Sequence, residues 1–532
     1  MEPRPRPQPV TRRTALLGAS ALGGTLALPT PAFAAPARPG PTAAAKPKSA
    51  AALGSYRAAY HYTIPDNWKN DPQRPLWIDG AYAYHTLYNA DYITGSEGTS
   101  WRLATSPDLV CYTDRGVALP KDTTPAGDAW SGSAVVDEDN TAGFGAGAVI
   151  ALVTMEPDAA ANSQAQYLWY STDSGRTFRP HGTQPVLPNP GVKDFRDPKV
   201  VRDTDRDRWV LALAERDKIG LYTSDDLKSW TYRSGFVRDG YGTLECPDLF
   251  RIKAADDTWH WVLAASANGS SSGLPATYAY WTGDFDGDTF AADADAPQWL
   301  DRGPDWYAAV TCEKRAADGT VDASARYAFA WTNSWDYPHN TPTLVADGFN
   351  GTDSITREIT LQRAGDGAYF LASRPTPALD AYVTRTTALG DVRVDGTTPL
   401  DFTGTAYEIR GELRWTPGET ENVGFQLRKA PGGTRHVDVG VYVAAGYAYV
   451  NRGGTLYPGG TRETHSPVDA DAGKLALRIL VDRTTVEVFV GEGRHVHTHQ
   501  AFGLPGDDRV ALYASGGPAV FGALEIRELG LG

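Results

Sequence analysis

A short phrase recurs four times in the first two thirds of the chain. A strand-like run ends in a small or polar residue and an acidic turn, at intervals of 65, 53 and 59 residues between Ser106, Ser171, Ser224 and Gly283. Each copy reads as a strand, an Asp-containing turn and a second strand. A hairpin that repeats at such intervals is the sequence signature of propeller blades. We therefore predict a five-bladed β-propeller over residues 53–375.

The pattern changes after Pro375. Apolar residues alternate with polar ones over 407–415 and 475–481, and Val486, Val488 and Val490 continue the alternation after a turn. A period of two, interrupted by short turns, predicts half-buried strands in two packed sheets. We predict a C-terminal β-sandwich over residues 380–532, so that the whole chain is all-β. This domain is expected to pack on the propeller, and glycan binding by it is a second possibility.

The N-terminus reads as an export signal. Arg12 and Arg13 precede an apolar stretch that ends at Ala32-Phe33-Ala34. This pattern is typical of a twin-arginine signal peptide over residues 1–34, and an ordinary secretory signal is the alternative. The apolar run is short and interrupted by Gly and Pro, so it does not predict a membrane span. Residues 35–52 predict a disordered linker, and the mature protein is expected to be secreted to the extracellular side.

Charge and cysteine content limit the classes of partner. The formal net charge is −14, which argues against nucleic acid and anionic membranes as partners. A neutral polysaccharide needs no such charge. The odd number of cysteines, Cys111, Cys246 and Cys312, leaves at least one thiol free, and a Cys111–Cys312 disulfide stays open. We interpret Cys246 as a small buried residue that shapes a site rather than as a nucleophile.

Three acidic motifs follow one another along the predicted propeller. They are Asn70-Asp71-Pro72, Arg196-Asp197-Pro198 and Glu245-Cys246-Pro247. Each motif alone is a common turn former. In a propeller, however, the inner strands converge on one axis, so carboxylates from different blades meet in one funnel. Cleavage of a glycosidic bond with retention needs two facing carboxyl groups, one as nucleophile and one as acid and then base.

This ordered set resembles glycoside hydrolase family 32, the fructan hydrolases and invertases, over about residues 55–532. The stretch Trp130-Ser131-Gly132-Ser133 is similar to an aromatic-Ser-Gly-Ser stretch of that family. The resemblance implies a five-bladed propeller, with Asp71 as nucleophile, Asp197 as transition-state stabiliser and Glu245 as acid/base. The family's usual Asn-Gly after the first motif is replaced by Gln73-Arg74-Pro75. That form is similar to a bacterial subgroup that acts on levan, the β-2,6 fructan.

We therefore expect an exported retaining hydrolase that cleaves levan and releases levanbiose, without a cofactor or a metal. The ionised Asp71 would attack while a protonated Glu245 donates to the leaving oxygen. A levan fructotransferase that forms a difructose dianhydride would use the same carboxylates. An inverting arabinan-type hydrolase and a non-catalytic fructan-binding protein are further alternatives. The sequence does not decide between endo and exo action, nor does it reveal the oligomeric state.

Residues around the motifs are candidates for sugar binding. Sugar rings have apolar faces and polar edges, so aromatic and amide side chains suit them. The candidates that we predict to bind substrate are Asn70, Gln73, Trp130, Ser131, Arg196, Trp306, Asn333 and Trp335. Arg196 has a second interpretation, in which it holds Asp197.

Two clusters suggest metals at first sight. Asp284 to Asp288 resembles the start of a calcium loop, but Thr289 stands where the loop needs Gly, so we interpret it as a blade turn. His495, His497 and His499 alternate and would share one strand face. Three such side chains can bind zinc. Without a second cluster, we interpret them as a solvated strand.

Overall fold

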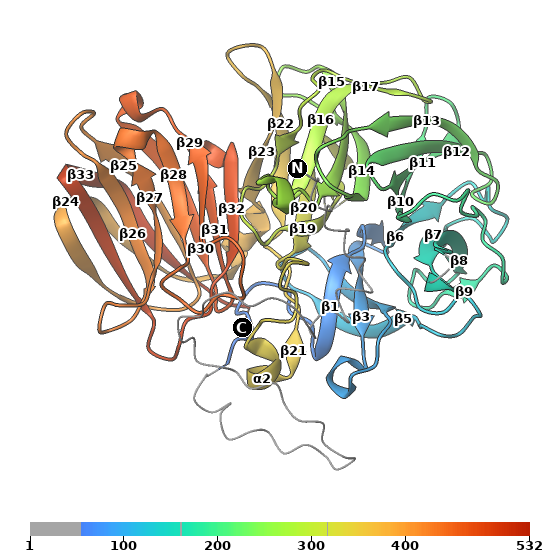
Figure 1. Cartoon of the computed structure of the whole chain (residues 1–532), viewed down its shortest axis with the longest axis horizontal. Coiled ribbons are helices and arrows are strands. Elements are labelled where there is room, and N and C mark those ends of the chain that lie inside the picture. The colour runs from blue at the N-terminus through green and yellow to red at the C-terminus, as the bar shows by residue number, and fades with distance from the viewer. Residues whose placement is uncertain (1–54, 160–161, 317, 532) are drawn as a thin grey trace, which may run out of the picture.

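The computed structural model describes residues 55–159, 162–316 and 318–531. The predicted signal peptide and linker lie outside the described residues. The described chain forms two bodies side by side, a propeller and a sandwich (Figure 1). No helix of the described part is long and apolar enough to cross a membrane. The short helical segments are α2 (Thr343–Asp347), η2 (Tyr92–Thr94), η4 (Ser270–Ser272), η5 (Pro377–Tyr382), η6 (Val443–Ala445), η7 (Ala470–Ala472) and η8 (Gly491–Gly493).

Five separate sheets, antiparallel except for one short parallel pair in the first, confirm the predicted propeller. Blades 1 to 3 consist of β1 (Asn67–Pro72), β2 (Leu76–Ile78), β3 (Ala81–Asn89), β4 (Ser100–Ser106), β5 (Thr113–Leu119); β6 (Gly132–Asp137), β7 (Ala148–Met155), β8 (Ala165–Ser171), β9 (Arg179–Pro180); β10 (Phe195–Asp203), β11 (Arg208–Glu215), β12 (Lys218–Ser224) and β13 (Thr231–Val237). Blades 4 and 5 consist of β14 (Leu244–Lys253), β15 (Trp259–Ala267), β16 (Tyr278–Phe285), β17 (Phe290–Ala292), β18 (Gln298–Trp299); β19 (Tyr307–Arg315), β20 (Val321–Trp331), β22 (Arg357–Arg363) and β23 (Tyr369–Pro375).

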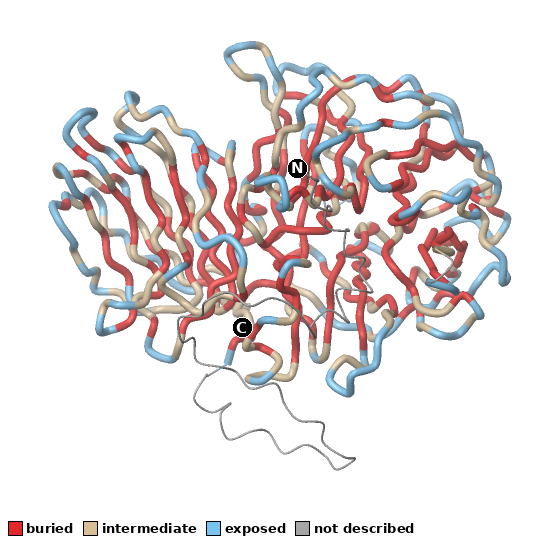
Figure 2. The backbone as a smooth tube through the Cα atoms, viewed as in Figure 1, coloured by how far each residue is buried: buried red, intermediate tan, exposed pale blue. Residues whose placement is uncertain are grey.

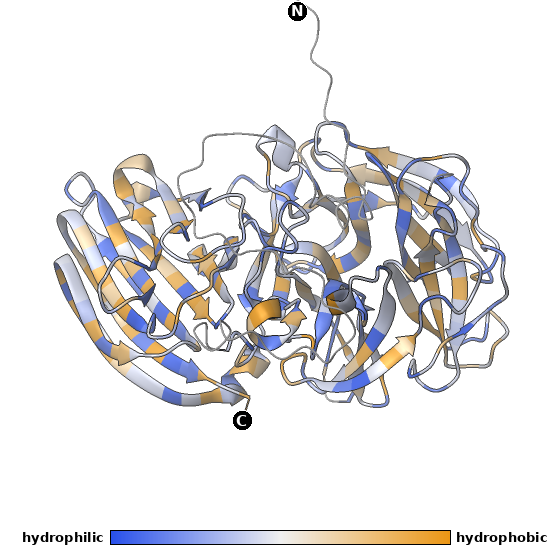
Figure 3. Cartoon of the chain, turned by 60° about the horizontal axis from the view of Figure 1, so that its bottom comes forward, coloured by the Kyte–Doolittle hydropathy of each residue, from blue (hydrophilic) through white to orange (hydrophobic). Residues whose placement is uncertain are grey.

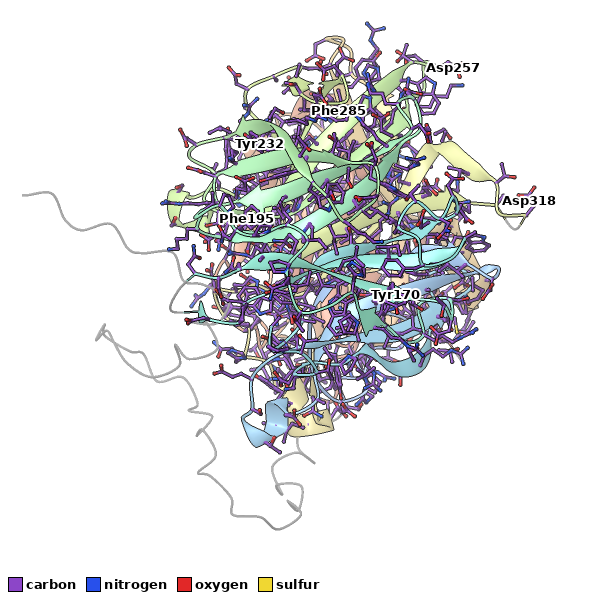
Figure 4. All side chains as sticks on the ribbon, turned by 90° about the vertical axis from the view of Figure 1, so that its right-hand side faces the viewer. Tyr170, Phe195, Tyr232, Asp257, Phe285 and Asp318 are labelled. Carbon is purple, nitrogen blue, oxygen red and sulfur yellow. The ribbon has the colours of Figure 1, made fainter. Side chains whose placement is uncertain are left out.

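The repeated phrase is the turn between the third and fourth strands of a blade. Ser171 ends β8, and its hydroxyl donates to Asp173 Oδ1 at 2.6 Å. Ser224 ends β12 and bonds Asp226 in the same way, at 3.0 Å. These aspartates also accept hydrogen bonds from backbone N–H groups of the turn. These bonds take the place of the strand-to-strand bonds that end at the turn. Figure 4 looks at the propeller from the side away from the sandwich, with Tyr170 on β8 and Tyr232 on β13.

The first blade is closed by a strand from much later in the chain. Residues Asn67 and Trp68 of β1 pair in parallel with β21 (Phe349–Asn350), which lies between β20 and β22 in sequence. β1 also pairs in antiparallel fashion with β3. Two neighbours thus fix the strand that carries the first acidic motif.

The C-terminal body is the predicted sandwich, with alternate residues facing its core. Its strands are β24 (Val383–Thr403), β25 (Tyr407–Trp415), β26 (Asn422–Lys429), β27 (Val437–Tyr442), β28 (Tyr447–Asn451), β29 (Glu463–Pro467), β30 (Lys474–Val481), β31 (Thr485–Val490), β32 (His495–Gln500) and β33 (Arg509–Leu529). The long β33 pairs with β26 through its first half and with β25 through its second half, and so joins both layers. Figure 3 shows the alternation of hydropathy along these strands.

Buried ion pairs join the sandwich to the propeller. Arg452 of the sandwich contacts Asp305 Oδ2 of the propeller at 2.6 Å, and both side chains are fully buried. Arg357 of β22 contacts Glu487 Oε2 of β31 at 2.8 Å, again with no exposure of either side chain. The strands on both sides of this contact are buried (Figure 2). The two domains therefore share a buried polar interface.

The three alternating histidines are not a solvated strand. They lie on β32, and both His497 and His499 are fully buried. Each ring bonds the hydroxyl of Thr464 at 2.8 Å. Burial lowers the pKa of His497 to about 3, with a smaller contribution from His495. The interpretation as a solvated strand was wrong because these two side chains face β29 inside the sandwich, and the period-two pattern does not reveal that this face of β32 is covered.

His61 predicts how stability depends on pH. Burial alone would lower its pKa, but hydrogen bonds to Asp482 and Glu487, both at 2.9 Å, raise it to about 9. The unfolded value is 6.5, so this stabilisation is complete below pH 6.5 and is lost as the pH rises through 9. We expect urea unfolding to show that His61→Gln, although less stable at pH 6, loses less stability than the wild type between pH 6.5 and 9. His465→Gln, at a half-exposed site, should lose as much stability as the wild type over this range. If the unfolding free energy of all three proteins has the same slope against pH, His61 is not the cause of the pH dependence.

Candidate active site

Each acidic motif lies at a bulge in an inner strand. The pairing register shifts between Lys69 and Pro72 in β1, between Arg196 and Lys199 in β10, and between Glu245 and Asp248 in β14. A fourth shift follows Tyr307 in β19. A bulge turns side chains out of strict alternation, and it suits proline, which lacks the N–H that a ladder needs. This explains why Pro follows the acidic residue or its neighbour in all three motifs.

Three of these bulges share a backbone conformation. Asp197, Cys246 and Ala308 have φ values of 59°, 46° and 52°, in the left-handed region. A non-glycine residue there is strained, and such strain is common at functional sites. Three neighbouring blades thus present equivalent pairs of residues at the same level of the funnel.

Asp71 is held through both of its carboxylate oxygens. Asn70 donates its side-chain amide to Oδ1 at 3.0 Å, and Ser131 donates its hydroxyl to Oδ2 at 2.5 Å. Asn70 is in turn oriented by the indole N–H of Trp68, at 3.0 Å. Gln73 donates to the Asp71 carbonyl and accepts from the Gly132 N–H, which ties β1 to β6. These hydrogen bonds fix the orientation of the carboxylate.

Cys246 lies between two of the carboxylates. Its Sγ is 3.7 Å from Asp71 Oδ2 and 3.6 Å from Asp197 Oδ2. The backbone N–H of Cys246 donates to Asp197 Oδ2 at 3.0 Å, and the Asp197 N–H donates to Thr154 Oγ1 at 2.9 Å. The Cys246 thiol is buried, and among the described residues none of Cys111, Cys246 and Cys312 forms a disulfide. Cys246 therefore contributes to the shape of the carboxylate cluster, as the sequence predicts.

Glu245 is held between two neighbouring blades. Arg196 of β10 donates Nε to Glu245 Oε1 at 3.0 Å, and Tyr307 of β19 donates its hydroxyl to Oε2 at 2.5 Å. Asp194 fixes the same guanidinium at 2.7 Å, and Gln164 accepts from it at 3.3 Å. Arg196, Glu245 and Tyr307 occupy the same position in three successive bulges, which is why they meet. Arg196 thus binds Glu245.

A cavity of about 140 Å³ opens beside Asn70. It is lined by blades 1 and 2 and by the loop after β20, and its walls include Trp68, Asn89, Glu97, Asp128, Trp130 and Trp335. Indole faces next to carboxylate and amide groups suit the faces and hydroxyls of a sugar. The structure therefore brings Trp130 and Trp335 to the site, on the side of Asp71.

Two predicted substrate-binding residues do not reach the site. Trp306 has no exposed surface and packs in the core of blades 4 and 5, where Arg357 stacks on its ring at 4.3 Å. Asn333 is also fully buried and stabilises its own loop through the Ser334 N–H and the Pro338 carbonyl. Both predictions were wrong for one physical reason. Sequence neighbours of a bulge point in different directions, and a motif does not show which one faces the funnel.

Tyr307 was missed for the same reason. It lies next to Trp306, and strand alternation alone gives no preference between the two. What distinguishes the two residues is their position in the bulge. Tyr307 stands directly before the residue with a positive φ, as Arg196 and Glu245 do. As for metals, no group of three or more His, Cys, Asp or Glu side chains in the described residues is arranged to hold one. The acidic turn near Asp286 instead bonds its own backbone N–H groups.

Comparisons with known proteins agree with this geometry. The family model of the glycosyl hydrolases family 32 N-terminal domain matches residues 61–373, and that of the family 32 C terminal matches residues 379–528. A levanbiose-producing levanase of Bacillus subtilis is 50% identical over 475 residues, 89% of this chain and 90% of the relative. One of Geobacillus stearothermophilus is 50% identical over 73% of this chain and 96% of the relative.

A solved structure extends the likeness to three dimensions. The crystal structure of exo-inulinase from Aspergillus awamori superposes with a TM-score of 0.79 and 27% identity, covering 89% of this chain and 98% of that one. Both domains are included at this coverage. With two family models that together span most of the sequence, the chain belongs to glycosyl hydrolase family 32.

Proposed function

We propose that this glycosidase hydrolyses the β-2,6 fructosyl bonds of levan with retention and releases levanbiose. One observation carries the proposal. Asp71 and Asp197 both lie beside Cys246, and the preceding residue, Glu245, is held by Arg196 and Tyr307 of two other blades. The 50% identity to two levanbiose-producing levanases supports the substrate. Export is part of the proposal, because a polysaccharide of this size is degraded outside the cell and the N-terminus carries the pattern of an export signal.

The reaction follows from the positions of the carboxylates. Asp71, oriented by two hydrogen bonds, attacks C2 of the fructosyl unit, while Glu245 gives its proton to the departing O6. Glu245 then removes a proton from water, the water attacks C2, and Asp71 leaves. Asp197 adds negative charge beside the oxocarbenium-like transition state. Tyr307 and Arg196 keep the Glu245 carboxyl in place through both steps.

The cavity beside Asn70 explains a disaccharide product. The cavity starts next to Asp71, the proposed nucleophile. Glu245, which protonates the leaving oxygen, does not line it. A second fructosyl unit on the non-leaving side of the bond therefore has a place to bind, between Trp130 and Trp335.

Digestion of pure levan tests the proposal directly. We expect mass spectrometry of the main small product to give a disaccharide of normal mass, because water completes the second step. A disaccharide lighter by one water would mean intramolecular fructosyl transfer, and free fructose would mean removal of single units. NMR of the first-formed anomer should show retention. Binding of levan without turnover would revive a non-catalytic role.

Tyr307→Phe tests how Glu245 is held. The substitution removes only the hydroxyl that donates to Glu245 Oε2. A hydrogen bond to a charged group contributes about 1.5–3 kcal/mol, so we expect kcat to fall about tenfold or more with KM little changed. Tyr337→Phe is the matched control, since that hydroxyl bonds Asp305 at the domain interface instead. A larger effect on KM than on kcat would mean that Tyr307 binds substrate rather than the acid/base.

A further inference from the structure

A second and larger cavity lies at the opposite end of the propeller channel. Its volume is about 570 Å³, within the range of small-molecule sites. The inner strands β6, β10, β14 and β19 begin at the active site, and the residues at their far ends, such as Val136, Arg202, Arg251 and Arg315, line this cavity. None of Asp71, Asp197 and Glu245 lines it. The turns after β14 and β19, marked by Asp257 and Asp318 in Figure 4, lie on one side of the propeller.

The cations at the rim of this axial cavity have carboxylate partners. Arg202 is 3.5 Å from Asp139, and Arg251 is 3.5 Å from Asp205. Arg315 pairs with Glu313. These pairs neutralise the rim, so they provide no net attraction for a charged ligand.

Two guanidinium groups deeper in the cavity lack such partners. Arg74 donates to the Val200 carbonyl at 3.2 Å, and Arg326 donates Nε to Thr311 Oγ1 at 3.1 Å. Arg326 is buried, and its guanidinium stacks on Phe250 at 4.5 Å. Among the described residues, neither arginine has a carboxylate oxygen within 4 Å. Both line the cavity.

Two carboxylates, Asp248 and Glu313, interact with Arg326 at longer range, and Glu313 also interacts with Arg74. Each of these carboxylates has a closer cation, and that of Glu313 is Arg315. The buried carboxylate of Asp248 is taken by Lys199, at 2.6 Å. Burial lowers the pKa of Lys199 to about 8, and Arg74 and Arg326 both add to the lowering. Burial, followed by Arg74, also lowers the pKa of Arg326. The two arginines therefore repel a third cation and each other, and unpaired charge in a partly desolvated site is costly.

We propose that the axial cavity binds a compact oxyanion, phosphate or sulfate, between Arg74 and Arg326. Planar guanidinium groups match the oxygens of such anions through paired hydrogen bonds. The remaining space is walled by Trp77, Tyr82, Trp209 and Trp261, so a phosphoryl group carried by a sugar also fits. The site is independent of the proposed reaction on levan.

Titration calorimetry of the full chain with inorganic phosphate, at constant chloride concentration, tests the proposal. We expect one site per chain, and at least about tenfold weaker binding in Arg74→Gln and in Arg326→Gln, because each loses a charge-assisted hydrogen bond. Arg251→Gln, which lines the same cavity but is paired with Asp205, should bind like the wild type. Unchanged far-UV spectra show that the variants are folded.

The outcomes separate the possible ligands. Fructose 6-phosphate that binds more tightly than phosphate, with the same dependence on Arg74, indicates that the site takes a sugar phosphate. Equal affinity for both indicates a free anion, and either result supports the oxyanion site. Absence of binding, equal loss in Arg251→Gln, or binding of unphosphorylated fructose with the same affinity would overturn it.

Discussion

Asp71→Asn is expected to lower kcat on levan by about 10⁴-fold or more, because an amide oxygen is too weak a nucleophile to attack C2. Asn70 and Ser131 already hold the side chain at this place, so the substituted amide fits without a change of fold. Steady-state release of reducing sugar measures the effect. Asp137→Asn is the matched control, since Asp137 is equally buried on an inner strand but bonds only its own turn, through Thr141 and Ala142.

Glu245→Gln extends this experiment to the acid/base. The expected loss on levan is about 10²–10⁴-fold, the usual contribution of a positioned proton donor. A substrate with a good leaving group needs less protonation in the first step, so it should lose less activity than levan does. The nucleophile variant should be equally poor on both substrates. Full activity of Asp71→Asn, or a control variant as inactive as it, would refute the assignment.

Arg452→Met is expected to lower the free energy of unfolding by about 3–5 kcal/mol, because it leaves Asp305 charged and buried between the domains. The same guanidinium also donates to the carbonyls of Gln500 and Gly459, and its loss leaves these acceptors without that donor. Urea unfolding measures the change. The double variant with Asp305→Asn should recover part of the loss, since it removes the unpaired charge.

Arg374→Ala provides the comparison at the same domain boundary. Arg374 of β23 contacts Glu492 of η8 at 2.8 Å, but both side chains are largely exposed. An exposed pair contributes about 0–1 kcal/mol, so this variant should be nearly as stable as the wild type. If both substitutions cost the same, burial is not what makes the interface pair important. A loss in Arg452→Met that Asp305→Asn does not reduce would point to packing instead.

Much of the fold is readable from the sequence because it depends on local repeats. The Ser-x-Asp turns mark where the third strand of a blade ends, and alternation marks the sandwich strands. The catalytic motifs are readable because a bulge needs a special backbone and favours Pro, which makes these positions stand out. Asp71, Asp197 and Glu245 were predicted in this way, and Asp71 and Asp197 both lie beside Cys246, the residue that follows Glu245.

What the sequence does not show is which side of a bulge faces the funnel, and which strands pack against one another. Trp306 was predicted to bind a sugar and is a core residue, while its neighbour Tyr307 contacts Glu245. His497 was predicted to be solvated because its strand is polar, yet its ring contacts Thr464 and Ser466 of β29 inside the sandwich. Both outcomes depend on contacts between segments far apart in sequence, which no local pattern encodes.

The strand that carries Asp71 is completed by residues that are synthesised long after it. Asn67 pairs with Phe349, and the segment before β1 is held by Asp482, whose carboxylate accepts the N–H groups of Ala59 and Tyr60. A chain leaves the ribosome from its N-terminus, so β1 has neither partner until most of the protein has emerged. Asp71 is therefore among the first residues of the domain to be made, and its strand is among the last to gain all of its neighbours.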